Sequence, residues 1–491
     1  MTLNSDQIIH EVYVEFEQMI DFVTNEAAYK ATADQIERGL FTRLLRIGRQ
    51  LLRLFFTLRS QMSTRDRWVT AEGEQLPYHR DSKRNYLSIF GKLPLWRPYF
   101  YRKGIGSACP LDAELSLGAD SYSDMVRELA EYLGVYGVYH KAGEILERIF
   151  GLQLSSRALQ AQILTDAQAV MAYYQQKPAP DPVAEAPVLV IQADGKGVPI
   201  IKHPSTPQPV RLGKGQKRGR KKEAIVTTAY TIAKAPRTAE EVLASYYQLE
   251  NDSEPEGEHS TPAGPQHKHL WATLEGKDTA LEWLAEQVEI RDGPHIQQRV
   301  ALCDGCQALQ TRLTAYFPAF VQILDFIHAN EYLWDVANAL LGEESADRLA
   351  WMVTHTRQLL TGQTQAVIAE LRLLSAAAGT TAVQRQQLEK TANYFERNLP
   401  YMDYATYLAR GWPIASGVIE GACRHFVKDR CELSGMRWSI SGAEQLLHLR
   451  AVAENGDWEA YHDFRRRQRH QSLYAQPYPE QEPLEVVALA A

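Results

Sequence analysis

Three acidic residues stand where packing alone does not explain an acid. Asp194 follows the apolar run VLVIQA, Asp304 follows VALC, and Glu420 follows SGVI. A carboxylate at the end of a buried strand costs desolvation free energy unless a cation compensates it. We therefore expect these three carboxylates to bind metal, because two Mg²⁺ (or Mn²⁺) ions about 3.5–4 Å apart are the usual apparatus for displacement at phosphorus.

The stretch VALCDGCQAL places Asp304 between Cys303 and Cys306, which have the spacing of a zinc knuckle. A structural zinc site needs four ligands, so the pair would have to recruit Cys423, Cys431 or a distant histidine. In the alternative interpretation, which we favour, the two cysteines are small apolar neighbours of a metal-binding aspartate.

Basic residues cluster in one short segment, although the net charge of the chain is −7. The segment RLGKGQKRGRKK, from Arg211 to Lys222, holds seven basic residues in twelve and lacks apolar periodicity. It is expected to bind phosphates, with a solvated loop as the alternative. On the last helix Glu420, Arg424 and Lys428 recur every four residues and so share one face. The residues expected to contact DNA are Lys214, Lys217, Arg218, Arg220, Lys221, Lys222, His328, Arg424, Lys428 and Arg437.

The elements that must position the three acids follow a proline-rich boundary near residue 180. VLVIQADGKGVPII predicts two strands joined by a tight Asp-Gly-Lys-Gly turn, and EAIVTTAYTIA predicts a third. LWATLEGKDTALEWLAEQVEI then predicts a helix, followed by the strand that ends at Cys303, a helix through Tyr316, and the strand FVQILDF. The order β-β-β-α-β-α-β, with a late helix carrying Glu420, matches a ribonuclease-H-like α/β core whose first and fourth strands lie side by side.

The region before this core is predicted to be mainly helical. Long amphipathic helices cover about Ser5 to Arg59, and a basic and aromatic hairpin turns near Gly91. Three helical patterns follow, separated by Gly134 and Gly151, and they form either a helical spacer or a helix-turn-helix. In a helix-turn-helix, Arg157, Gln160 and Gln162 would face the DNA groove.

The expected domains are 1–120 (helices and hairpin, DNA-end recognition), 121–180 (three-helix unit), 181–330 (first part of the core), 331–410 (helical insertion), 411–455 (catalytic-glutamate helix) and 456–491 (basic, then flexible tail). No run approaches the roughly 20 uncharged residues of a membrane span, and the N-terminus lacks the pattern of a secretory signal. We therefore expect a cytoplasmic protein without membrane association.

From about Val188 to Arg450, the chain resembles the DDE-type transposases of bacterial insertion sequences, most closely the ISKra family. The segments that carry the resemblance are QADGKGVPI, RLGKGQKRGRKKEAIVTTAYTI, LCDGCQALQ, ILDFIHANEYLW and GVIEGACRHFVKDRCELSGMRWSISGAEQLLHLRA. It implies that Asp194, Asp304 and Glu420 form the acidic triad. Asp325-Phe-Ile-His328 is similar to an element that Mutator-like relatives place after the second aspartate. Relatives often carry cysteine pairs near the N-terminal hairpin, where this chain has only Cys109.

The resemblance implies a transposase that cleaves DNA and transfers 3′-hydroxyl ends with two Mg²⁺ or Mn²⁺ ions. Its partners would be the terminal repeats of the insertion sequence, target DNA, and further copies of the chain in a homo-oligomer. Two alternatives stay open. One is a non-catalytic DNA-binding regulator derived from a transposase. The other is a zinc hydrolase built on Cys303, Cys306 and His328.

Overall fold

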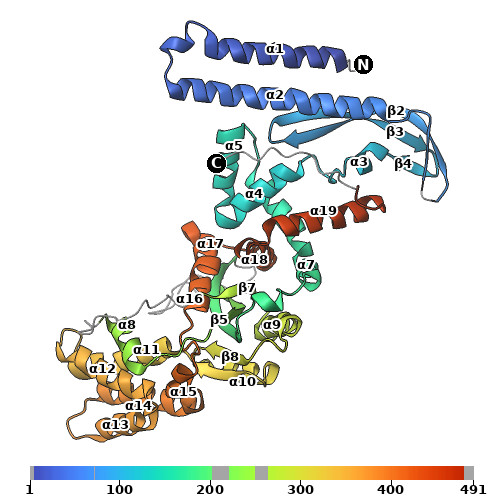
Figure 1. Cartoon of the computed structure of the whole chain (residues 1–491). Helices are drawn as coiled ribbons and strands as arrows, with labels where there is room; N and C mark the ends of the chain where they lie inside the picture. The colour runs from blue at the N-terminus through green and yellow to red at the C-terminus, as the bar shows by residue number, and fades with distance from the viewer. Residues whose placement is uncertain (1–4, 71, 202–219, 249–263, 480–491) are drawn as a thin grey trace, which may run out of the picture. The chain divides into compact units, whose positions relative to one another are not determined.

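A computed structural model describes residues 5–70, 72–201, 220–248 and 264–479. The chain forms two compact units, one of Met1–Tyr173 with Asp457–Ala491 (unit 1) and one of Tyr174–Gly456 (unit 2) (Figure 1). Lys214, Lys217 and Arg218 of the predicted basic loop lie outside the described residues. No helix within the described ranges is long and apolar enough to cross a membrane.

Unit 1 begins with two long helices, α1 (Ser5–Thr24) and α2 (Ala33–Met62), which lie side by side (Figure 1). An antiparallel sheet follows, with the order β1 (Arg67–Val69), β2 (Gln75–Ser88), β3 (Gly91–Arg102) and β4 (Gly106–Ala108). The predicted hairpin is confirmed, since Ser88 pairs with Gly91. Phe56 of α2 packs with Leu93 and Leu95 of β3 in a small apolar core.

The remaining helices of unit 1 come from both ends of the chain. They are α3 (Pro110–Glu114), α4 (Asp124–Tyr136), α5 (Tyr139–Phe150), α6 (Ser156–Asp166) and α19 (Trp458–Tyr474), with α7 (Val170–Gln176) at the boundary of the two units. Gly151 ends α5 with a φ of 68°, as predicted, but Gly134 lies inside α4, which ends at Gly137. The segment that we expected to be a basic tail contains the helix α19.

Unit 2 is a mixed α/β structure around one five-stranded sheet. Its strands are β5 (Val188–Ile200), β6 (Arg220–Ile232), β7 (Gln266–Thr273), β8 (Gln298–Cys303) and β9 (Val321–Leu324), in the order β7-β6-β5-β8-β9. β5, β6 and β7 pair antiparallel, whereas β5, β8 and β9 pair parallel. The first and fourth strands are therefore neighbours, as predicted.

Two predicted elements of this sheet are wrong. The Asp-Gly-Lys-Gly segment is no turn, because β5 continues from Val188 to Ile200 and pairs with β6 along its whole length. The third strand is instead β7, which takes Leu270–Thr273 from the predicted helix, so that α9 (Lys277–Arg291) begins only after Gly276 with its φ of 114°. Because one predicted strand is lost and another is gained, the number of strands agrees with the prediction. The helix α8 (Ala239–Tyr247) was not predicted.

Side chains alternate between the two faces of the sheet. Leu189 and Ile191 pack against α9 and α10 (Gln307–Tyr316) in one core. Val188 and Val190 belong to a second core with α11 (Phe326–Leu341) and the helical block. That block contains α12 (Asp347–Leu360), α13 (Thr364–Ala376), α14 (Ala382–Asn398) and α15 (Tyr404–Ala409), in agreement with the predicted helical segment (Figure 1). The helices α16 (Gly417–Gly421), α17 (Asp429–Cys431) and α18 (Ile440–Glu454) follow it.

Candidate active site

The register of the sheet aligns three aspartates in one row. Gln192 of β5 pairs with Leu302 of β8, so continuing this parallel register by two residues brings Asp194 opposite Asp304. Cys303 pairs with Leu324 of β9, so the next position brings Asp304 opposite Asp325. Since neighbouring strands lie about 4.8 Å apart, the three carboxylates share one edge of unit 2.

The first two aspartates influence each other electrostatically. Asp194 and Asp304 are half-buried. Burial, followed by the nearby charge of Asp194, raises the pKa of Asp304, whereas the charges of His328 and Lys277 oppose this shift. Asp304 Oδ1 also accepts a hydrogen bond of 3.1 Å from the Cys306 N–H. A half-buried carboxylate whose charge is disfavoured by a neighbouring carboxylate belongs to a site where a cation would be stabilised.

Asp325 is the acid that sequence reasoning did not include among the site residues. Its side chain is 1% exposed, and burial together with the charge of Glu420 raises its pKa to about 7. Oδ1 caps α11 by accepting from the Ile327 N–H at 2.7 Å, and Oδ2 accepts from the Ser416 hydroxyl. The signal was present in the sequence, because FVQIL followed by an acid repeats the pattern of the other two strands.

Glu420 reaches this edge on the short helix α16 through two contacts. The Ser416 hydroxyl lies 3.0 Å from Glu420 Oε1 and also contacts Asp325. Gln192, fully buried in β5, accepts a hydrogen bond of 2.9 Å from the Ile419 N–H and donates one of 3.1 Å to the Tyr230 hydroxyl. These contacts place the first turn of α16 against β5, while the Glu420 side chain stays exposed. The structure thus brings Asp194, Asp304 and Glu420 to one region, as predicted.

The chain beyond Glu420 is not the regular α-helix that the four-residue spacing assumed. Ala422–Lys428 forms a π-helix, with hydrogen bonds from i to i+5, so the three-residue face of Glu420, Arg424 and Lys428 is altered. The Cys423 thiol donates to Asp194 Oδ2 at 3.3 Å, and burial raises the pKa of this thiol. π-Helical turns often occur at functional sites, and this one ties the glutamate segment to the first aspartate.

The two cysteines beside Asp304 do not point to a common zinc site. Cys303 packs with Leu189 and Ile191 in the core on the face of the sheet opposite Leu302, and Cys306 packs partly against the same core. Burial raises the pKa of the Cys303 thiol, which disfavours the thiolate that zinc requires. The packing of both cysteines against one apolar core agrees with the interpretation of them as apolar neighbours of Asp304.

The donor set suits a hard cation, although the side chains are not gathered around one point. Asp194, Asp304 and Glu420 offer only carboxylate oxygens, the ligands that Mg²⁺ prefers. Across the ranges that the structure describes, no three His, Cys, Asp or Glu side chains stand close enough together to hold a metal ion. The carboxylates would have to rotate toward one another to bind one.

The residues predicted to contact DNA differ in their exposure and in their ion pairs. Lys222, Arg424, Lys428 and Arg437 are exposed. Lys221 forms an ion pair with Glu432, so its charge is already compensated. Arg220 begins β6. His328 is partly exposed, and its Nδ1 lies 3.6 Å from Glu331 Oε2. The charge of His328 opposes the rise in the pKa of both Asp304 and Asp325, so His328 lies near the row of aspartates.

The helical block touches the turn that carries Asp304. Arg397 of α14 donates to the Gly305 carbonyl at 2.8 Å, and a Cβ on Gly305 would overlap the Tyr394 ring. Tyr394 in turn stacks on Tyr332 with ring centroids 3.8 Å apart. The insertion therefore helps to hold the turn after β8.

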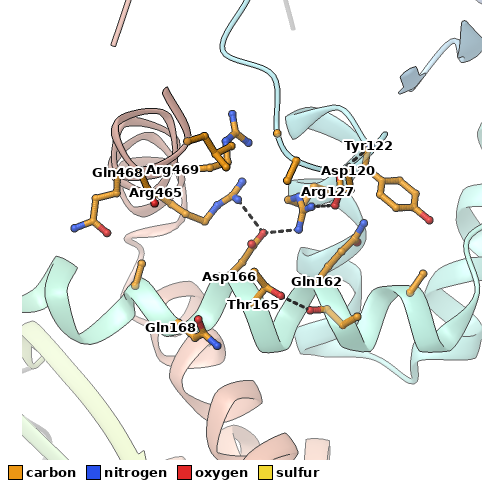
Figure 2. A pocket seen from close by; sticks show the side chains of 17 residues that line it. Asp120, Tyr122, Arg127, Gln162, Thr165, Asp166, Gln168, Arg465, Gln468 and Arg469 are labelled. Atoms are coloured by element: carbon orange, nitrogen blue, oxygen red, sulfur yellow. Dashed lines mark hydrogen bonds and ion pairs between the residues drawn. The ribbon is translucent and has the colours of Figure 1, made fainter. Parts of the chain in front are cut away.

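Unit 1 has a pocket of about 690 Å³ between α4, α6 and α19. Figure 2 shows Asp166 between the guanidinium groups of Arg127 and Arg465, whose Nη1 atoms lie 3.1 and 3.0 Å from its Oδ2. Gln162 lines the pocket, but both polar atoms of its amide are buried without a hydrogen-bond partner. Gln162 is therefore not placed to face a DNA groove, as the helix-turn-helix alternative would require, whereas Arg157 on the same helix is exposed.

The basic run of α19 is compensated by acids of α4 and α6. Arg465 and Arg469 form ion pairs with Asp124, and Arg466 pairs with Glu128. These residues therefore stabilise unit 1 and do not form a separate basic tail.

Comparison with known proteins gives little. No protein family and no curated protein matches the sequence. Among solved structures, the Drosophila P element transposase strand transfer complex is similar over 75% of this chain and 86% of that chain, with 8% identity and a TM-score of 0.26. A likeness at that TM-score carries no argument about this chain.

Proposed function

We propose that this chain is a DDE-type transposase with a ribonuclease-H-like core, a helical insertion and a catalytic glutamate on the segment after it. The observation that carries the proposal is the row formed by Asp194 within β5, Asp304 after β8 and Asp325 after β9. The sheet has the order β7-β6-β5-β8-β9, and Glu420 is brought to the same row. The resemblance of the sequence to insertion-sequence transposases points the same way.

In this proposal Asp194, Asp304 and Glu420 hold two Mg²⁺ or Mn²⁺ ions. When bound, such ions activate an attacking water or 3′-hydroxyl and stabilise the leaving oxygen at phosphorus. Gln192 and Ser416 fix the backbone and side chain of the Glu420 segment. The raised pKa of Asp304, which burial and then the charge of Asp194 cause, supports a cation at this edge.

The substrate would be the terminal repeats of an insertion sequence and then target DNA. The exposed residues Lys222, Arg424, Lys428 and Arg437 are suited to phosphate contacts, which position a duplex without reading its sequence. His328, beside Asp304 and Asp325, would contact the scissile strand. The proposed phosphate contacts also include Lys214, Lys217 and Arg218, which precede Lys222 in the same basic segment of the sequence.

The test compares Asp194→Asn and Asp304→Asn with Asp347→Asn, an exposed aspartate of the helical insertion. Each purified protein is incubated with DNA that flanks its coding region and with Mg²⁺ or Mn²⁺. We expect the first two variants to lose strand cleavage and to keep DNA binding within about threefold, because they remove metal ligands and no phosphate contact. The control should cleave like the unmodified protein.

Cleavage at the unmodified rate by either active-site variant would contradict the assignment of the triad. Unmodified protein that binds the ends and never cleaves them, with either metal, would instead identify a non-catalytic DNA-binding regulator.

A further inference from the structure

An apolar stripe runs along the exposed side of α1. The large apolar side chains on it are Ile9, Tyr13, Phe16, Ile20 and Val23, which are 36–65% exposed. They recur at intervals of four and three residues, which is the a/d repeat of a helix that packs against another helix. Only Ile8 of this helix is fully buried, so most of the apolar surface of α1 is uncovered within the chain.

A matching stripe runs along α2. It consists of Phe41, Leu44, Leu51, Phe55, Leu58 and Met62, which are 41–81% exposed. The intervals are again three or four residues, with one gap where Gly48 approaches the Phe90 ring. The repeat therefore covers about six turns of a helix whose other sides contact α1 and β3.

Both stripes open on the same side of the helix pair. Phe22 of α1 lies against Gly39 and under the Arg43 guanidinium of α2, and Glu11 pairs with Arg53, so these residues mark the α1–α2 contact. At about 100° of rotation per residue, each stripe lies roughly 100–150° around its helix from that contact. Both stripes are rotated from the contact in the same sense about their helices. Because the two helices are antiparallel, rotation in the same sense brings both stripes to the same side of the helix pair.

The area of this face is that of a protein interface. If each of these large side chains has about 150–250 Å² of surface, the eleven exposed fractions amount to about 1,000 Å² of apolar surface. A standard interface buries about 800 Å² per partner, and the largest apolar patch on a typical monomer is about 300–600 Å². A narrow a/d stripe on two antiparallel helices fits another pair of helices, as in a four-helix bundle.

The charges of the helices indicate which partner fits. Within its bounds α1 contains five Asp or Glu residues and no Lys or Arg, so it would be repelled by DNA or by an anionic membrane. α2 contains six Arg residues against Asp34 and Glu37. A second copy of this chain, with its α2 beside this α1 and its α1 beside this α2, pairs acidic with basic helices twice about a twofold axis.

We propose that α1 and α2 form a homodimer interface, a four-helix bundle between two copies of the chain that is held by the two apolar stripes. A homo-oligomer is already part of the expected function, and this inference adds the surface that forms it. It does not depend on the proposed catalytic site, since no residue of unit 2 takes part.

The first experiment measures the mass of the full chain by light scattering during size exclusion, at low and high salt. The expected result is twice the 55.6 kDa of one chain. The variant Phe16→Gln, Ile20→Gln, Leu44→Gln, Leu51→Gln should have the mass of one chain with an unchanged circular dichroism spectrum. The control Leu373→Gln, Val383→Gln, at two apolar residues that are each 73% exposed, should remain a dimer.

A second measurement does not need the fourfold variant to fold. A mixture of Phe16→Cys and Leu44→Cys chains is treated with a short bismaleimide, and we expect at least a fivefold higher yield of two-chain product than with Leu373→Cys. A monomeric unmodified chain, or a fourfold variant that folds and stays dimeric, would overturn the proposal. Binding of the unmodified monomer to phosphatidylglycerol vesicles through these residues would also overturn it, in favour of a membrane surface.

Discussion

Gln192 is the residue whose removal most directly tests how Glu420 is positioned. It is a polar side chain buried in a strand of apolar residues, and its two hydrogen bonds reach the Ile419 N–H and the Tyr230 hydroxyl. Gln192→Met keeps the length and approximate volume of the side chain, and it removes both hydrogen bonds of the amide. The strand itself should therefore be preserved.

The size of the effect follows from the two hydrogen bonds that are lost, one to the Ile419 N–H and one to the Tyr230 hydroxyl. The Ile419 N–H also donates to the Ser416 carbonyl at 2.9 Å, so it keeps one acceptor. The loss of one hydrogen bond costs about 0.5–1.5 kcal/mol, which should favour local opening of α16 and speed amide exchange at Ile419 roughly 2- to 12-fold. The Tyr230 hydroxyl is also buried, and burial raises its pKa well above the usual range. Adding Tyr230→Phe to Gln192→Met should recover about 1–3 kcal/mol of global stability without slowing exchange at Ile419.

The assay is hydrogen exchange of the peptide that contains Ile419, read beside urea unfolding. Gln310→Met is the matched control, because Gln310 is also buried and donates to Asn398 at 2.7 Å. We expect it to lower global stability and to leave exchange at Ile419 unchanged. If Gln192→Met leaves exchange at Ile419 unchanged, or if Gln310→Met speeds it equally, the reasoning on α16 is wrong.

Three further outcomes can be checked. Gly305→Ala should destabilise unit 2 by about 1–3 kcal/mol through overlap with Tyr394, measured by urea unfolding, and Tyr394→Leu should restore part of the loss. Arg465→Gln should cost about 1.5–3 kcal/mol by removing one of the two guanidinium groups that hold the buried Asp166 carboxylate, whereas the exposed Arg467→Gln should be neutral. Burial lowers the pKa of His269 to about 3, so its contribution is complete above pH 6.5 and is lost by about 1.4 kcal/mol per pH unit as the pH falls toward 3. His269→Gln should flatten that slope in thermal unfolding, and an unchanged slope would contradict the role of His269.

The strands that carry the aspartates could be predicted because their pattern is local. A continuous apolar run followed by an acid marks the end of a strand that is buried on both faces, and this rule finds Asp304 and, in retrospect, Asp325. The helical block and the hairpin near Gly91 were likewise predictable from periodicity.

The elements that were predicted wrongly depend on partners far along the chain. Asp194-Gly195 has the composition of a turn, but thirteen paired residues of β6 hold it extended. The contacts of Asp325 with Ser416 and of Gln192 with Ile419 span 91 and 227 residues. The π-helix after Glu420 is equally invisible to a rule based on four-residue spacing. Local propensity cannot encode such pairings, because tertiary packing decides them.

Unit 1 is built from both ends of the chain, so the order of synthesis determines when it can finish folding. More than half of the chain is made between Tyr173 and Asp457, the two points where the chain leaves unit 1 and returns to it. Until then Asp166 has only the guanidinium of Arg127, and Asp124 lacks those of Arg465 and Arg469. Since buried carboxylates without cations are costly, the helices before Tyr173 should reach their final packing only when α19 has emerged. A ribosome-bound chain would therefore complete unit 2 before unit 1.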